Sequence, residues 1–170
     1  MCLNPEGDIC AVFGDTFDGK VGTPGWRSPV GLLSKTKNLD DGIVWDHALG
    51  GDPNYARQLW HYIHDQTKNW SNGGISTVIP SDIITIGNKM YLHAIVNRGF
   101  GNVTWTEIQE SDDNGHTWHH SGARFDAGIC NGNAQLWTWD LGPDGYVYVM
   151  STGFQRNDPC LLYTSDAADE

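Results

Sequence analysis

The chain has 170 residues, enough for one domain with a sizeable core. Its formal net charge of −11, from 21 acidic and 10 basic residues, argues against nucleic acid and against an anionic membrane surface as partners. Eight Trp and 21 Gly are compatible with aromatic binding surfaces and many tight turns, but neither count separates a sugar binder from another β-protein.

No apolar run approaches the length that spans a bilayer, and the opening "MCLNPEGD" lacks the basic and apolar regions of a signal peptide, so we expect a soluble chain. The cysteines at positions 2, 10, 130 and 160 show no C-x-x-C spacing that would indicate a metal site. Their pairing stays open, and Cys10, in an apolar strand, is expected to be a small core residue.

In chain order, three segments look alike: residues 7–17, 87–99 and 144–154 each begin with a two-residue turn and continue as a strand. The second and third are preceded by further strands, "DIITI" at 82–86 and "AQLWTWDL" at 134–141, which predicts hairpins. Hairpins repeated at intervals of several dozen residues favour an all-β fold, a β-propeller of four-stranded antiparallel blades.

Both ends of the chain depart from a complete propeller. The strand that should precede Gly7 is missing, and "CLLYTSDAADE" at 160–170 breaks off the repeat and is similar to translated sequencing-adapter read-through. We therefore expect residues 1–159 to form an incomplete propeller of roughly two and a half to three blades, with 160–170 outside the fold. On this reading the chain is a fragment.

The stretch "SDDNGHTW" at 111–118 fills every fixed position of S-x-D-x-G-x-T-W. Asp113, Asn114 and Gly115 are typical of a tight turn, and Thr117 and Trp118 are good openers of the following strand. The pattern resembles the Asp-box of sialidase-type propellers. That resemblance implies that Asp113 staples a hairpin between two outer strands, away from the central cleft.

Six segments follow one another in the order "FGDTF", "WRSPVGLLS", "ARQLWHYIHD", "STVIPSD", "KMYLHAIVNRG" and "WTEIQESDDNGHTW". Together they resemble a secreted β-propeller family that was long described only as a domain of unknown function. That family has since been associated with endo-D-arabinan hydrolysis. The resemblance runs from about residue 7 to residue 154. It implies a secreted or cell-surface glycoside hydrolase, five-bladed when complete, that acts on a furanose polysaccharide such as D-arabinan. We expect a monomer with a polysaccharide substrate and no cofactor.

Asp15 is the first catalytic candidate. It follows the apolar strand at 9–13 and stands between Phe13 and Phe17, and a carboxylate among apolar neighbours can have a pKa high enough for a general acid. The structural alternative is that Asp15 caps its own turn through Thr16. The resemblance favours catalysis, because Asp15 falls on the aspartate of the motif.

Glycoside hydrolysis ordinarily needs two carboxylates, and in the family the second lies on the strand before "FGDTF". Here that strand would lie before Met1, so we expect this chain alone to be inactive. Asp82, which we expect at the start of an inner strand, either faces the cleft or bonds its own turn, and the two roles weigh about equally. Asp46, with His47, is a weaker candidate of the same kind. Arg27 either fixes a cleft carboxylate in a bidentate pair or lies exposed on an outer strand.

The loop "QLWHYIHD" brings His61, His64 and Asp65 close in sequence. No third or fourth ligand follows at metal-site spacing, so we predict no metal and favour hydrogen bonds to sugar hydroxyls or simple exposure. Trp60 and Tyr62 are candidate stacking platforms.

Three hypotheses of different classes follow. The first is a fragment of a glycosidase. The alternatives are a non-catalytic propeller that binds glycan or protein, and a structural extracellular domain. For the first, we expect Asp15 and Asp82 to face one side of the array, with the 61–65 loop over it and Asp113 well away.

Overall fold

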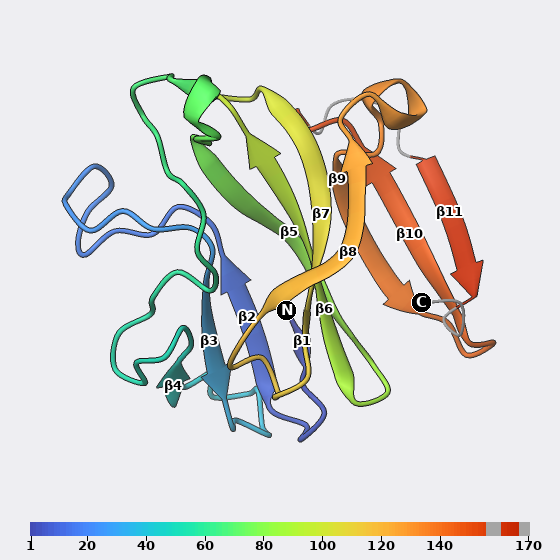
Figure 1. The fold of residues 1–170 in the computed structure, drawn as a ribbon. Coiled ribbons are helices and arrows are strands. Elements are labelled where there is room, and N and C mark those ends of the chain that lie inside the picture. Colours follow the sequence, from blue (N-terminus) through green and yellow to red (C-terminus); the bar gives the residue numbers. More distant parts are fainter. Residues whose placement is uncertain (156–160, 167–170) are drawn as a thin grey trace.

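The computed structural model describes residues 1–155 and the backbone of 161–166. In these residues the chain forms three consecutive antiparallel sheets and no α-helix (Figure 1). None of the described helical segments is long and apolar enough to cross a bilayer. The fold is therefore all-β, as the alternation in the sequence predicts.

The strands follow the chain in simple meanders. The first sheet has the order β1 (Cys2–Leu3), β2 (Ile9–Phe13), β3 (Val30–Ser34), β4 (His47–Ala48). The second has the order β5 (Thr77–Ile86), β6 (Lys89–Asn97), β7 (Val103–Ser111), β8 (His119–Asp126). The third contains β9 (Leu136–Leu141), β10 (Tyr146–Thr152) and β11 (Leu161–Asp166). Two short 3₁₀ turns, η1 (Trp70–Asn72) and η2 (Ile129–Gly132), lie in the connections.

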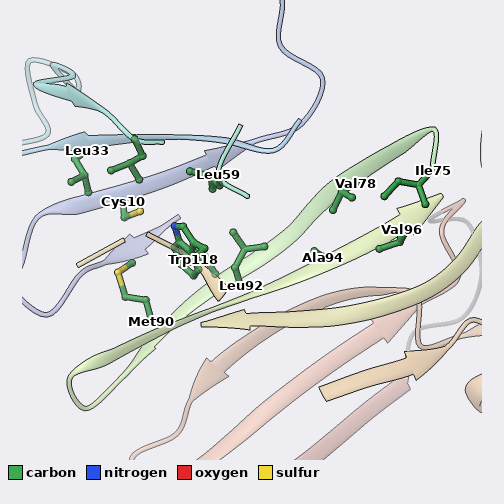
Figure 2. Close-up of a cluster of buried hydrophobic side chains, with 12 residues drawn as sticks. Cys10, Leu33, Leu59, Ile75, Val78, Met90, Leu92, Ala94, Val96 and Trp118 are labelled. Atoms are coloured by element: carbon green, nitrogen blue, oxygen red, sulfur yellow. The ribbon is translucent and has the colours of Figure 1, made fainter. Parts of the chain in front are cut away.

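The main core lies between the first and second sheets (Figure 2). Alternate residues of β6 point into it, because successive side chains of a strand face opposite sides of a sheet. Met90 and Leu92 on β6 are fully buried there, beside Cys10 of β2 and Trp118, which follows β7. A smaller cluster around Trp139 fills the space between the second and third sheets. Burial on both faces explains why β6 carries an almost unbroken apolar run.

The predicted hairpins are present. Gly87, with a φ of 57°, closes the β5–β6 turn, and 142–145 close the β9–β10 turn. The first strands of the three sheets lie next to one another, with β5 in contact with both β1 and β9. The sheets fan out without joining into a ring (Figure 1). Four-stranded antiparallel units are thus confirmed for the first two sheets, while the propeller and its number of blades remain a proposal.

Three boundaries differ from expectation. β5 begins at Thr77 and not at Asp82, because the strand continues through a register shift between Pro80 and Asp82. A strand does precede Gly7: the two-residue β1 pairs with β2, with Leu3 opposite Ile9. The backbone of 161–166 is not separate from the fold, since it pairs with β10 as β11. Residues 156–160 and 167–170 of the expected boundary and tail lie outside the described residues.

The 111–118 turn joins β7 to β8 and is held by its own side chains. The Ser111 hydroxyl donates to Asp113 Oδ1 at 2.8 Å, and Asp113 accepts from the amide and the hydroxyl of Thr117 at 2.8 and 2.6 Å. Burial alone would raise the pKa of Asp113, but the bonds from Thr117 and Ser111 outweigh it and lower that pKa. The Trp118 indole donates to the Gly115 carbonyl, and β8 begins two residues later than expected, at His119. In this geometry Asp113 stabilises a turn.

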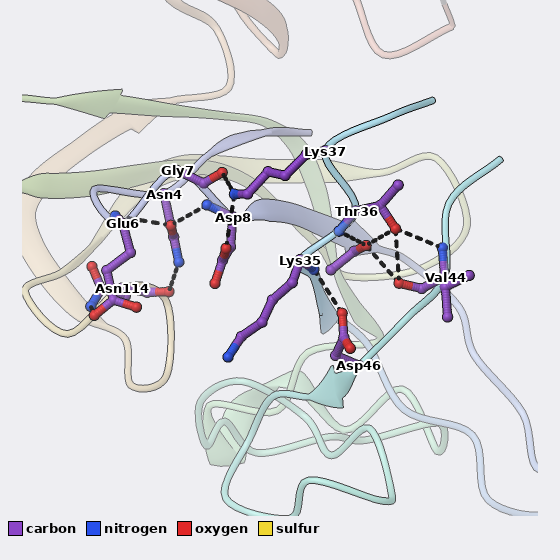
Figure 3. A network of polar contacts seen from close by, with 11 residues as sticks. Asn4, Glu6, Gly7, Asp8, Lys35, Thr36, Lys37, Val44, Asp46 and Asn114 are labelled. Atoms are coloured by element: carbon purple, nitrogen blue, oxygen red, sulfur yellow. Dashed lines mark hydrogen bonds and ion pairs between the residues drawn. The ribbon is translucent and has the colours of Figure 1, made fainter. Parts of the chain in front are cut away.

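The same turn is tied to the first sheet (Figure 3). Asn4 Oδ1 accepts from the amides of Glu6 and Asp8, which closes the β1–β2 turn. Asn4 Nδ2 donates to the Asn114 carbonyl, and the Asn114 side chain donates to Glu6. These bonds fix the β7–β8 turn beside the beginning of β2, whereas Asp15 follows the end of that strand.

Candidate functional site

Asp15 lies where the first sheet meets the second. Its exposed carboxylate follows β2, and Oδ1 accepts from Trp26 Nε1 at 2.9 Å and from Thr77 Oγ1, at the start of β5, at 3.4 Å. The Thr16 hydroxyl donates to the Gly14 carbonyl and not to Asp15. Asp15 is therefore positioned by residues far away in the sequence, in contrast to the local cap that was the alternative.

A surface pocket of about 620 Å³ opens beside this carboxylate. We call it the Asp15 pocket. Its aromatic walls include Phe13, Phe17 and Trp45, and the Phe13 and Trp45 rings meet edge to face with centroids 6.0 Å apart. Such a pocket combines apolar faces with one acidic acceptor, which suits a ring that carries both C–H faces and hydroxyl groups.

The 61–65 loop contacts Trp26, the residue that donates to Asp15. The His64 imidazole stacks on Trp26, the donor to Asp15, with ring centroids 4.2 Å apart. The Tyr62 hydroxyl donates to the Ser28 carbonyl at 2.6 Å. Burial raises the pKa of Tyr62, and the nearby Asp15 charge adds to that rise, so this hydroxyl remains a donor at neutral pH. His64 thus acts on Asp15 only through Trp26.

Arg27 binds the carboxylate of Asp18, and it does so through a single nitrogen and not in a bidentate pair. Its Nη1 donates to Asp18 Oδ1 at 2.8 Å, and its Nε donates to the Ala56 carbonyl. The guanidinium lies 4.2 Å from the centre of the Tyr55 ring, and the Tyr55 hydroxyl also donates to Asp18 at 2.7 Å. The bond from Tyr55, followed by those from Arg27, lowers the pKa of Asp18. Arg27 therefore organises the loop after Asp15.

Two other candidates are engaged in local structure. Asp46 Oδ2 accepts from the Lys35 amide at 2.7 Å beside the edge of the first sheet (Figure 3). Asp65 Oδ1 accepts from the amide and the hydroxyl of Thr67, and the hydroxyl bond is the main reason that the pKa of Asp65 is lowered. Neither contact leads to the Asp15 pocket, since neither residue lines it.

Asp82 links the second sheet to the third. Its Oδ2 accepts from Thr138 Oγ1 at 2.7 Å and from the Trp139 amide at 3.2 Å, both on β9. Asp15 instead bonds Thr77, at the other sheet boundary. The structure therefore does not bring Asp15 and Asp82 into one site, and the contacts of Asp82 are those of a structural residue.

Trp60 and His61 line a second pocket, of about 360 Å³. We call it the Glu107 pocket, after the buried carboxylate at its base. Glu107 was not a candidate in the sequence analysis, although the alternation "WTEIQ" places it on the same face as Trp105 and Gln109. Within the part of the chain that the structure describes, no group of three or more His, Cys, Asp or Glu side chains could hold a metal ion.

These features define an all-β protein of consecutive antiparallel sheets with an acidic, aromatic-lined surface site. Residues 1–169 match the family described as "Domain of unknown function (DUF4185)", and the chain belongs to this family. The matched range includes most of 160–170.

The chain is also similar to a curated protein of Mycolicibacterium smegmatis named "Uncharacterized 35.9 kDa protein in asd 3'region". The two are 26% identical over 167 residues, which cover 91% of this chain and 46% of the relative. The chain thus spans about half the length of that relative.

Proposed function

We propose that this chain is part of a glycoside hydrolase that acts on a furanose polysaccharide such as D-arabinan, with Asp15 as one of its two catalytic carboxylates. The observation that carries the proposal is the position of Asp15, an exposed carboxylate at the wall of an aromatic-lined pocket. The bonds from Trp26 and Thr77 orient it without enclosing it. Asp15 also falls on the aspartate of the "FGDTF" motif, which the resemblance assigns to catalysis.

In this proposal Asp15 either protonates the leaving oxygen or attacks the sugar, and a second carboxylate completes the reaction. Asp18 is the nearest acidic residue along the chain and does not suit that role. Arg27 and Tyr55 both donate to its Oδ1, and its lowered pKa keeps it ionised at neutral pH, so it cannot supply a proton as the general acid. Asp18 is therefore not the second carboxylate, and β1, the strand before β2, carries no acidic residue.

The test is release of oligosaccharides from D-arabinan by this chain and by the same chain extended to complete the propeller. We expect Asp15→Asn to lower the rate by about 10²-fold or more, because it removes a proton-transfer or nucleophilic group. Asp41→Asn, an exposed acid-to-amide change outside the Asp15 pocket, is the matched control and should keep full activity. Equal rates for the parent protein and Asp15→Asn would eliminate Asp15 as a catalytic group.

The alternative is a non-catalytic module that binds glycan through the aromatic walls of the same pocket. Phe13 and Trp45 favour it, since both are large, apolar and exposed. Retention of D-arabinan without any hydrolysis, abolished by Trp45→Ala, would support binding in place of catalysis. Hydrolysis that depends on Asp15 would reject it.

A further inference from the structure

The Glu107 pocket lies on the outer half of the boundary between the first two sheets. The outermost strand of the first sheet, β4, has only two residues, so it does not cover β7 and β8 of the second sheet. Parts of the 60–75 loop border that region instead, and the pocket remains between this loop and the strands. Its walls combine Trp60, Ile63 and Trp105 with the polar groups of Glu107, His120 and Arg124.

The sheet face that forms the pocket is apolar on β6 and carries polar side chains on β7. Trp105, Glu107 and Gln109 share one face of β7 because they alternate along the strand. Their register partners on β6 all belong to the apolar core: Val96, Ala94 and Leu92. An ordinary packing face would continue as apolar residues. A carboxylate and an amide in these positions indicate a polar function.

Glu107 is held in a defined orientation although only 6% of the residue is exposed. Its Oε2 accepts from Trp105 Nε1 at 2.7 Å and from Arg124 Nη2 at 3.3 Å, and Oε1 accepts from Gln109 Nε2 at 3.0 Å. His120 Nε2 lies 3.8 Å from Oε2. A buried carboxylate is tolerated only with such partners. Because a carboxylate offers about four acceptor positions, it keeps capacity for a further donor.

We propose that the Glu107 pocket is a binding site for a neutral saccharide. A sugar hydroxyl can donate to Glu107 and accept from Arg124 or His120, so one ligand uses both kinds of group. Glu107 repels an anionic ligand and Arg124 repels a cationic one, so the pocket favours a ligand without net charge. The indole and aliphatic surfaces of Trp60 and Ile63 receive the C–H face of the ring. The volume of about 360 Å³ lies within the usual range of small-ligand sites.

This site is separate from Asp15. Thr77 bonds the Asp15 carboxylate, whereas Val78, the next residue of β5, lines the Glu107 pocket. Adjacent residues of a strand point to opposite faces, so Thr77 and Val78 face the two sites from opposite sides of β5, while the 61–65 loop borders both. The inference therefore goes beyond the proposed hydrolysis and does not depend on it.

The experiment is titration of the 170-residue chain with neutral, anionic and cationic sugars, followed by the indole N–H signals in ¹H–¹⁵N NMR. The probes are arabinose, galactose and glucose, with glucuronate and glucosamine as the charged counterparts. We expect the neutral sugars to shift the Trp105 and Trp60 signals. The charged counterparts should bind more weakly.

Glu107→Gln should weaken neutral-sugar binding by about tenfold or more, since a hydrogen bond to a charged acceptor is lost. Asp41→Asn makes an acid-to-amide change at an exposed residue that does not line the pocket, and should leave binding within about twofold. Asp15→Asn should also leave it unchanged, which separates this site from the proposed active site.

If Glu107→Gln fails to fold, Arg124→Gln replaces it, because Arg124 is largely exposed on an outer strand and its loss should weaken the same binding. The assignment is overturned if no neutral sugar binds, if glucosamine or glucuronate binds more tightly, or if neither variant changes the affinity.

Discussion

His93 gives the sharpest test of how the second and third sheets pack. It lies in the middle of β6, fully buried, and its imidazole stacks on Trp137 with centroids 4.0 Å and planes 2° apart. Neither ring nitrogen has a hydrogen-bond partner within the described part of the chain. Asp82 is its register partner on β5, but the Asp82 carboxylate is bonded to β9. Burial lowers the pKa of His93 to about 3.

This lowered pKa makes stability depend on pH in one direction. In the unfolded chain a histidine has a pKa of about 6.5, so below that value the unfolded state binds a proton that the folded state does not. The free energy of unfolding then falls by about 1.4 kcal/mol for each unit by which the pH drops below 6.5, until the pH approaches the pKa of the folded state. Between pH 7 and pH 5 the contribution of His93 to the free energy of unfolding falls by about 2 kcal/mol.

The assay is urea unfolding of the parent chain and of His93→Phe at pH 7 and pH 5, followed by tryptophan fluorescence. Phenylalanine keeps a flat ring against Trp137 and does not titrate. We expect the parent chain to lose about 2 kcal/mol more than the variant on acidification. The lowered pKa values of Asp65 and Asp113 matter only at more acidic pH and are common to both proteins. An equal loss in both proteins would refute the reasoning.

Two further predictions concern hydrogen bonds that join strands. Asp113→Ala removes the acceptor of both bonds from Thr117 and should lower the free energy of unfolding by about 2 kcal/mol. The control is Asp112→Ala at the neighbouring exposed residue, which should change it by about 0.5 kcal/mol or less. Equal values in urea denaturation would contradict the role of Asp113 in holding the turn. Asp82→Ala should loosen β9 from β5 without unfolding the chain, so that the Trp139 amide, which donates to Asp82, exchanges with deuterium about tenfold faster. Unchanged exchange would mean that other contacts hold β9.

The sequence predicted the elements whose signals are local. The hairpin at 87–88 and the turn at 111–118 depend on glycine, asparagine and aspartate in positions that favour tight turns. The beginning of β5 was missed because Pro80 and Ser81 look like a loop, and only pairing with β6 shows that the strand continues through them. β1 was missed because two residues are too few for a periodic pattern.

The candidate site was predicted less well, because it depends on pairing between distant segments. The catalytic role of Asp15 stays a prediction, and its bond to Thr77 joins residues 62 positions apart and leaves no pattern in the sequence. The stacking of His64 on Trp26 was not foreseen either, because the two rings come from separate loops. For Asp82 the sequence left a cleft role and a structural role open, and it placed the start of the strand five residues too late, at Asp82 and not at Thr77.

Glu107 illustrates why burial alone does not distinguish packing from binding. On β6 the face toward the first sheet is closed by β2 and β3, and every side chain there is apolar. On β7 the same face extends beyond the two-residue β4, where nothing in the first sheet can cover it. A saccharide in that space would desolvate Glu107 further, and the bonds from Trp105 and Gln109 are what make this tolerable.

The ladder between β5 and β6 also determines whether the two sites act together. Thr77 pairs with Asn97 and Val78 with Val96, so both sites share one hydrogen-bonded strand pair. Coupling between sites requires an element with two alternative arrangements, and a paired strand whose Val78 and Val96 are buried in the core offers none. We therefore expect no coupling through this strand pair, and any effect of the Glu107 pocket on Asp15 would have to pass through the 61–65 loop, which borders both sites. A polysaccharide could still engage both sites at once, and its gain would then come from effective concentration and not from a change in shape.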